Sequence, residues 1–229
     1  MQRGTAYEDK KTAKIANMLF TGLTINAGFT LASLPFFINL FLLNFEINYY
    51  LLLPVTSLFF FLAFGAAYAC YDEWLEQNML FKPLKLFFTY WWKQLKRHLF
   101  EWLLFGTFLS INLFNIIGMM NSSWSYLNVF FVLLFQGVLV WYLAFHYLAL
   151  KNSEQSNKNL LFHSFYFTVG KWYRSLLNAL LFDLMLFMMF FKPVIGFMVA
   201  PAVVISLIYL NTRGIFKDLR KETESENKL

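Results

Sequence analysis

Few side chains in this sequence have the types and spacing that catalysis or metal binding requires. The histidines His98, His146 and His163 are far apart, and no His-Glu-x-x-His pattern occurs. None of the ten glycines belongs to a phosphate-binding loop pattern. The single cysteine, Cys70, permits neither an intrachain disulfide nor a cysteine-rich metal site. We therefore predict no catalytic residues, no metal, no cofactor and no enzymatic activity.

Asp183 is the one acidic residue deep inside an apolar stretch, so it is the candidate intramembrane functional residue. It either couples or binds a transported species, or it is held by polar groups of a neighbouring helix as a structural contact. Other polar residues in apolar stretches leave the same two interpretations open, since they either line a path or pair across helices: Asn26, Asn39, Asn112, Asn115 and Gln136.

The overall composition of the chain is that of a membrane protein. Of 229 residues, 59% are hydrophobic, 21% are aromatic and only 14% are charged, whereas about 25% are charged in ordinary globular domains. This composition argues against a soluble enzyme, a nucleic-acid-binding module and a secreted disulfide scaffold. The expected partner is instead the lipid bilayer.

Apolar runs long enough to cross a bilayer recur along the chain. We predict an all-α, polytopic helix bundle in a single domain over residues 1–211. Its six spans are expected at 17–44, 50–71, 99–119, 126–150, 172–190 and 194–210. The last two form a short hairpin that turns at Lys192-Pro193, and a re-entrant pair that does not fully cross is the alternative.

The basic residues predict the orientation of these spans. They collect in residues 1–16, 72–98 and 151–175 and after 211, while the short connections at 45–49 and 120–125 contain none. Lys and Arg gather on the cytoplasmic side of membrane proteins. Both termini are therefore predicted to be cytoplasmic in a multi-pass cell-membrane protein, with residues 212–229 as a charged cytoplasmic tail.

Two cytoplasmic segments have the pattern of amphipathic helices, at 80–97 and 160–174. In the first, an apolar arc (Leu84, Phe87, Phe88, Trp91, Leu95) opposes a basic arc (Lys82, Lys85, Lys93, Lys96, Arg97). The second repeats the pattern more weakly, with Lys171 and Arg174 as its cations. These seven cations are a candidate surface for a partner or for anionic lipid. Packing of the first helix on the ends of neighbouring spans is the alternative interpretation.

Several short motifs suggest a family. Leu34-Pro35 ends the first span, Gly65-Ala66-Ala67-Tyr68 ends the second, and an aromatic and basic segment from Phe87-Phe88 to Lys96 leads into Trp102. In these features and in segment order the chain resembles the YesL-like integral membrane proteins of Gram-positive bacteria. That family has no established activity. Its members are associated with carbohydrate uptake systems of the ABC type, so the resemblance implies an accessory or regulatory membrane subunit.

The expected function is therefore that of a non-enzymatic membrane protein acting with a carbohydrate ABC transporter. This expectation is based on the lack of catalytic groups, on the two cytoplasmic amphipathic segments and on the family resemblance. The alternative is a small transporter or channel in its own right, with Asp183 in the pathway.

Overall fold

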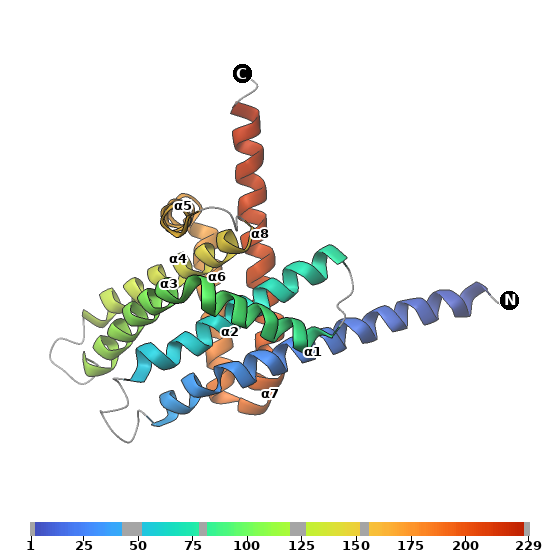
Figure 1. Ribbon diagram of the computed structural model, residues 1–229, viewed down its shortest axis with the longest axis horizontal. Helices are drawn as coiled ribbons and strands as arrows, with labels where there is room; N and C mark the ends of the chain where they lie inside the picture. Colours follow the sequence, from blue (N-terminus) through green and yellow to red (C-terminus); the bar gives the residue numbers. More distant parts are fainter. Residues whose placement is uncertain (1–2, 43–51, 78–81, 120–126, 152–155, 227–229) are drawn as a thin grey trace.

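The structure is a computed structural model that describes residues 3–42, 52–77, 82–119, 127–151 and 156–226. These residues are all-helical, with no strand among them, which confirms the all-α part of the prediction (Figure 1). The helices are α1 (Arg3–Leu42), α2 (Leu53–Gln77), α3 (Pro83–Met119), α4 (Asn128–Lys151), α5 (Asn157–Gly170), α6 (Trp172–Phe191), α7 (Pro193–Met198) and α8 (Ala200–Glu226).

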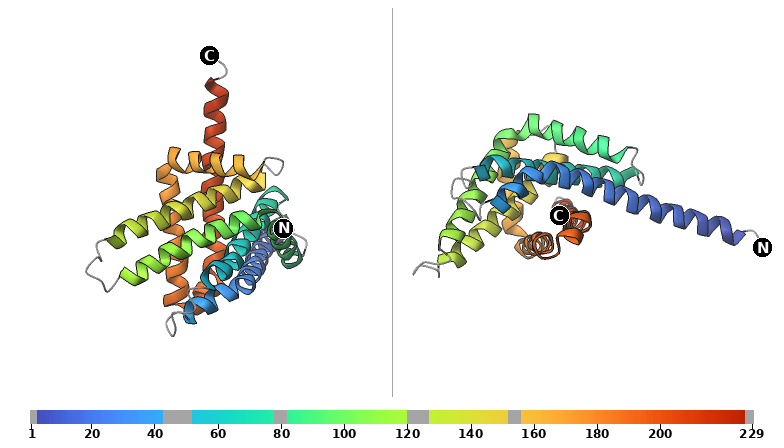
Figure 2. Two further views of the ribbon diagram at one scale, coloured as in Figure 1. Left: turned by 60° about the vertical axis from the view of Figure 1, so that its left-hand side comes forward. Right: turned by 90° about the horizontal axis from the view of Figure 1, so that it is seen from below.

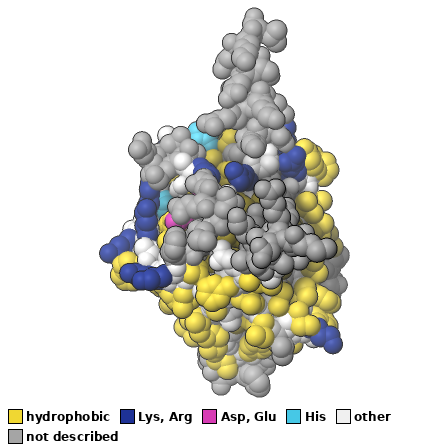
Figure 3. Space-filling model, turned by 90° about the vertical axis from the view of Figure 1, so that its right-hand side faces the viewer, with side chains coloured by type: hydrophobic (Ala, Val, Ile, Leu, Met, Phe, Trp, Pro, Cys, Tyr) yellow, Lys and Arg dark blue, Asp and Glu magenta, His cyan; other side chains and the backbone are white. Residues whose placement is uncertain are grey.

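Four of these helices are long and apolar enough to cross a membrane. The qualifying segments are Leu19–Leu42, Leu53–Leu75, Pro83–Ile116 and Asn128–Lys151. Large apolar side chains on their outer faces are exposed, as Leu31 of α1 and Leu133 of α4 illustrate. An apolar surface of this breadth is typical of contact with lipid. On the face drawn in Figure 3, Lys and Arg side chains gather above a broad hydrophobic area.

The helix α2 forms the centre of the bundle. Every residue from Phe60 to Tyr71 is buried. A stripe of small residues (Ala63, Ala66, Ala67 and Cys70) lies within this segment and is buried inside the bundle. Its larger neighbours form a chain of aromatic contacts, such as the Phe60 and Phe29 rings at 5.6 Å. Small side chains let neighbouring helices come close, and the aromatic rings fill the remaining space.

The first half of α3 lies across α2 in the opposite direction. Gln94 lies beside Gly65, and Gly106 lies beside Ser57, so the two helices are antiparallel. The predicted segments 80–97 and 99–119 belong to one helix, and it bends at His98, which has non-helical φ and ψ of −125° and 25°. Pro83 occupies the first turn, where its missing N–H removes no hydrogen bond.

The helices α6 and α8 pack together as a hairpin that crosses the α1–α4 layer steeply (Figure 2). The helix α6 ends at Lys192, and Pro193 begins the short helix α7, so the chain reverses at the predicted position. The end of α6 and the helix α7 lie very close at this reversal. A Cβ on Gly196 would lie 2.4 Å from the carbonyl oxygen of Met188. The predicted span 194–210 is divided between α7 and the first part of α8.

The junction between α7 and α8 depends on α1 for its hydrogen bonds. The carbonyl of Phe197 would normally accept from the N–H four residues later, but that residue is Pro201, which has none. The Asn26 side-chain amide donates instead to the carbonyls of Phe197 and Met198, at 2.6 and 2.5 Å. The Thr30 hydroxyl adds a third contact, 3.2 Å from the Phe197 oxygen. Polar side chains of α1 thus supply the hydrogen bonds that the backbone lacks at the junction of α7 and α8.

The predicted amphipathic helix 160–174 is not one continuous helix. Ser156 caps the N-terminus of α5, and its hydroxyl oxygen accepts from the backbone of Asn159 at 3.4 Å. The helix α5 ends at Gly170, and the chain departs from helical geometry at Lys171. Arg174 consequently belongs to α6. The apolar pattern carries on through this break, which explains why the sequence suggested a single helix.

Candidate functional site

All five cations of the first half of α3 are exposed: Lys82, Lys85, Lys93, Lys96 and Arg97. We call these five residues the α3 cationic face. Lys96 also lies over the Trp92 ring, with its Nζ 5.2 Å from the ring centroid, a geometry that favours the charged amine.

The opposite side of the same helix packs mainly on the bundle. Phe87 is fully buried, and a Cβ on Gly28 of α1 would lie 2.8 Å from its ring. Trp91 stacks on Phe59 with ring centroids 6.2 Å apart. Leu84 and Phe88 remain exposed. The alternative interpretation, packing on neighbouring spans, therefore applies to Phe87 and Trp91, whereas the cationic face stays accessible.

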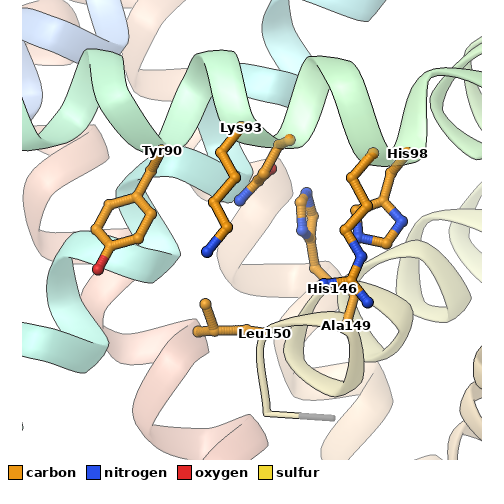
Figure 4. Close-up of a pocket in the computed structure, with 8 residues that line it drawn as sticks. Tyr90, Lys93, His98, His146, Ala149 and Leu150 are labelled. Carbon is orange, nitrogen blue, oxygen red and sulfur yellow. The ribbon is translucent and has the colours of Figure 1, made fainter. Parts of the chain in front are cut away.

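A small polar pocket lies between α3 and the end of α4 (Figure 4). Its volume is about 70 Å³. Figure 4 shows Lys93 and His98 extending from α3 toward α4, with the His146 ring between the two helices. The lining residues are Tyr90, Lys93, Gln94, Arg97, His98, His146, Ala149 and Leu150. The sequence named Lys93 and Arg97 as surface cations but did not indicate that they adjoin two histidines.

The imidazoles at this pocket are held in place by the protein. His146 is buried, and its Nε2 lies 3.3 Å from the carbonyl oxygen of Phe61 on α2. His98 is 4% exposed, with its Nδ1 4.0 Å from a carboxylate oxygen of Glu101. The ring of Trp102 lies 4.1 Å from that of His146, centroid to centroid. These contacts fix the wall of the pocket in one arrangement.

A charged network joins the C-terminal parts of α2 and α4 to the middle of α8. The Lys151 Nζ lies 2.6 and 2.7 Å from the two carboxylate oxygens of Asp72. The Tyr209 hydroxyl of α8 donates to the same carboxylate. Nearby, the Tyr90 hydroxyl of α3 donates to Glu73 Oε2 at 2.5 Å. Sequence reasoning missed this network, because its three members come from helices whose adjacency is a property of the fold.

Asp183 has a partner on another helix. Its Oδ2 accepts from Gln136 Nε2 of α4 at 2.6 Å, whereas Gln136 Oε1 is buried with no partner among the described residues. Asn39 donates to the Thr56 hydroxyl of α2 at 3.0 Å. Asn112 instead donates to the Phe108 carbonyl within its own helix at 2.7 Å. Pairing across helices is thus seen for Asp183, Gln136 and Asn39 but not for Asn112.

Lys171 and Arg174 lie at the junction of α5 and α6. The Arg174 guanidinium packs against α8, since a Cβ on Gly214 would lie 2.7 Å from its nitrogen. The Asn211 amide of α8 donates to the Arg174 carbonyl at 2.9 Å and to Asn178 Oδ1 at 2.8 Å. Arg174 thus takes part in the α6–α8 contact, unlike the exposed cations of α3.

Comparisons with protein-family models, with curated proteins and with solved structures found no match to this chain. Within the described ranges, no three His, Cys, Asp or Glu side chains come together as a metal site.

Proposed function

We propose that this chain is a non-enzymatic, multi-pass membrane protein that acts by binding another membrane protein through the α3 cationic face. The observation that carries the proposal is that this face is exposed while Phe87 and Trp91 on the other side anchor the helix to the bundle. A partner with an acidic surface can therefore bind without unfolding any part of the chain. The resemblance to YesL-like proteins suggests the membrane subunits of a carbohydrate ABC transporter as this partner.

The proposed topology has six spans and both termini in the cytoplasm. It requires α2, α4 and the first part of α8 to end on the same side of the membrane. The contacts that Asp72 makes with Lys151 and Tyr209 support this arrangement, because they bring these three ends together. The exposed Lys192 between α6 and α7 lies at the other end of the hairpin.

Cysteine labelling tests the topology. Single cysteines at positions 48, 123 and 192, in a Cys70→Ala background, should react with an impermeant thiol reagent added to intact cells. Cysteines at positions 93, 158 and 221 should react only after the membrane is opened. Labelling of position 221 from outside would contradict the even number of crossings that the hairpin requires. Failure of position 192 to label from outside would contradict complete crossing.

Partner capture tests the proposed function. The triple variant Lys82→Gln, Lys85→Gln and Lys96→Gln removes three exposed cations that do not line the pocket. We expect it to lose most of the transporter subunits recovered with the wild-type chain from cells grown on different sugars, because each cation contributes about 1 kcal/mol near an anionic surface. Its thermal stability in detergent should stay near that of the wild type, since exposed charges contribute little to folding.

The matched control changes a residue on the packed side of the same helix. Trp91→Ser removes a ring that stacks on Phe59, and burial of a large side chain contributes about 1.5–3 kcal/mol. This variant should lose stability before it loses partner. Recovery of the same partners with the triple cation variant, or recovery of the wild-type chain alone on every sugar, would refute the proposed function.

A further inference from the structure

Exposed or half-buried residues of α3 at helical spacing are cationic before the bend at His98 and apolar after it. Positions 93 and 97 precede the bend, and positions 100, 104, 108 and 111 follow it at intervals of three or four residues. The first two are the exposed Lys93 and Arg97, whereas Phe100, Phe108 and Ile111 are exposed at 72%, 48% and 53%. Such a change along one helix matches the boundary between lipid headgroups and acyl chains.

The pocket between α3 and α4 lies beside the cationic part of α3. Its volume of about 70 Å³ is several times the about 10–15 Å³ that one water needs. Two buried polar atoms of its lining, His98 Nδ1 and Gln94 Oε1, have no hydrogen-bond partner among the described residues. Buried polar atoms are normally partnered. The pocket thus combines two cations with unfilled hydrogen-bonding capacity.

Two carboxylates adjoin this lining. Glu101 approaches His98 Nδ1 at 4.0 Å, and Glu73 accepts from the Tyr90 hydroxyl at 2.5 Å. Neither forms an ion pair with Lys93 or Arg97 among the described residues. These two cations can therefore pair with the single negative charge of a phosphate diester.

An apolar groove lies along the part of α3 that follows His98. Its volume is about 310 Å³, and it is lined by Phe100, Leu103, Leu104, Thr107, Phe108 and Ile111. The eleven steps from residue 100 to residue 111 cover about 16 Å at 1.5 Å per residue. This length suits most of an acyl chain lying along the helix.

We propose that α3 binds one anionic phospholipid, with its phosphate in the pocket beside Lys93 and Arg97 and an acyl chain in the groove from Phe100 to Ile111. The His98 imidazole donates to a phosphate oxygen. This inference rests on the membrane location in the proposed function but not on the partner protein. The lipid site uses two of the five cations of the α3 cationic face, and the partner-capture variant changes the other three.

The test is lipid binding to the purified full chain in a neutral detergent, followed by native mass spectrometry and by thermal stability. Phosphatidylglycerol should bind as one retained molecule and raise the melting temperature. Phosphatidylcholine should bind at least tenfold more weakly. Inorganic phosphate at the same concentration should give no stabilisation, because it lacks the acyl chain.

Variants locate the site. Lys93→Gln with Arg97→Gln should weaken phosphatidylglycerol binding about 30-fold, since each cation near an anionic group contributes about a factor of five. The matched control, Lys82→Gln with Lys85→Gln, removes the same charge from the same helix outside the pocket and should bind like the wild type. Phe108→Ser tests the groove and should also weaken binding, with the chain still folded because Phe108 is exposed.

If both double cation variants weaken phosphatidylglycerol binding equally, the lipid is held by non-specific electrostatic attraction and the proposed pocket is wrong. Stabilisation by inorganic phosphate as large as that by the lipid, with Phe108→Ser binding normally, would overturn the lipid in favour of a free phosphate. Lipid binding that survives the Lys93 and Arg97 variant would also refute the proposal. Partner capture by the Lys82, Lys85 and Lys96 variant is measured separately, so failure of either proposal is recognised without the other.

Discussion

Gly65→Leu is expected to destabilise the bundle more than any other single change considered for this chain. A Cβ on Gly65 would lie 1.9 Å from His146 Cε1 and 2.1 Å from Gln94 Oε1. Gly65 is itself buried on α2, so α2 cannot move away without disturbing the core. Overpacking of a core costs about 1–3 kcal/mol, and a leucine here should reach the upper end of that range.

The measurement is the melting temperature in detergent, which falls by about 2–4 °C for each kcal/mol in a chain of this size. The matched control is Gly137→Leu on α4. Gly137 is exposed, and a Cβ there would meet nothing within 4 Å. This change should be neutral or slightly stabilising, because leucine is a better helix former than glycine by somewhat less than about 1 kcal/mol. A Gly65→Leu protein as stable as Gly137→Leu would contradict the close approach of α2, α3 and α4.

Asp72→Ala is expected to have the second largest effect. It removes the carboxylate that accepts from both Lys151 and Tyr209, leaving an amine and a hydroxyl without that acceptor. Removing one partner of a fully buried pair costs about 3–5 kcal/mol. The Lys151 side chain is 32% exposed and can be partly solvated, so we expect a loss of about 2 kcal/mol.

A double-mutant cycle separates the pair from its surroundings. Lys151→Ala in the Asp72→Ala background should cost little more, because the lost partner has already removed the interaction. Tyr209→Phe removes only one hydrogen bond to the carboxylate and should cost less than Asp72→Ala, about 1 kcal/mol. Lys158→Ala, at an exposed position on α5, should change stability by no more than about 0.5 kcal/mol. Additive losses for Asp72 and Lys151 would show that the two residues act independently.

The helical class and the reversal near Lys192 could be predicted from the sequence, because both depend on local properties. Apolar run length indicates helices long enough to cross a membrane, and the Lys192-Pro193 pair interrupts the last apolar stretch at one point. The sequence did not predict the separation of α5 from α6, because the local apolar pattern continues through the break at Lys171. Lys171 follows a glycine within a continuous apolar pattern, and that pattern alone does not show that the helix stops.

The contacts around the candidate site were not predictable, because they join residues distant in sequence. The importance of Gly65 depends on His146, and the position of Asp72 depends on Lys151. The sequence did place Asp183 and Gln136 in apolar stretches and suggested pairing as one of two interpretations, but it did not indicate that they pair with each other. The α3 cationic face was identified by its periodicity, whereas the pocket beside it requires knowing that α4 ends there.

The hydrogen bonds from Asn26 to the carbonyls of Phe197 and Met198 have a consequence for biogenesis. They join residues 171 and 172 positions apart, so the ribosome has made nearly the whole chain before they can form. Until then the break between α7 and α8 has carbonyl groups that its own backbone does not satisfy. Such groups are unfavourable in lipid. In the proposed six-span topology, α1 must therefore be in place before the α6–α8 hairpin can complete its hydrogen bonds. We expect the last hairpin to reach its final packing only after α1 has folded.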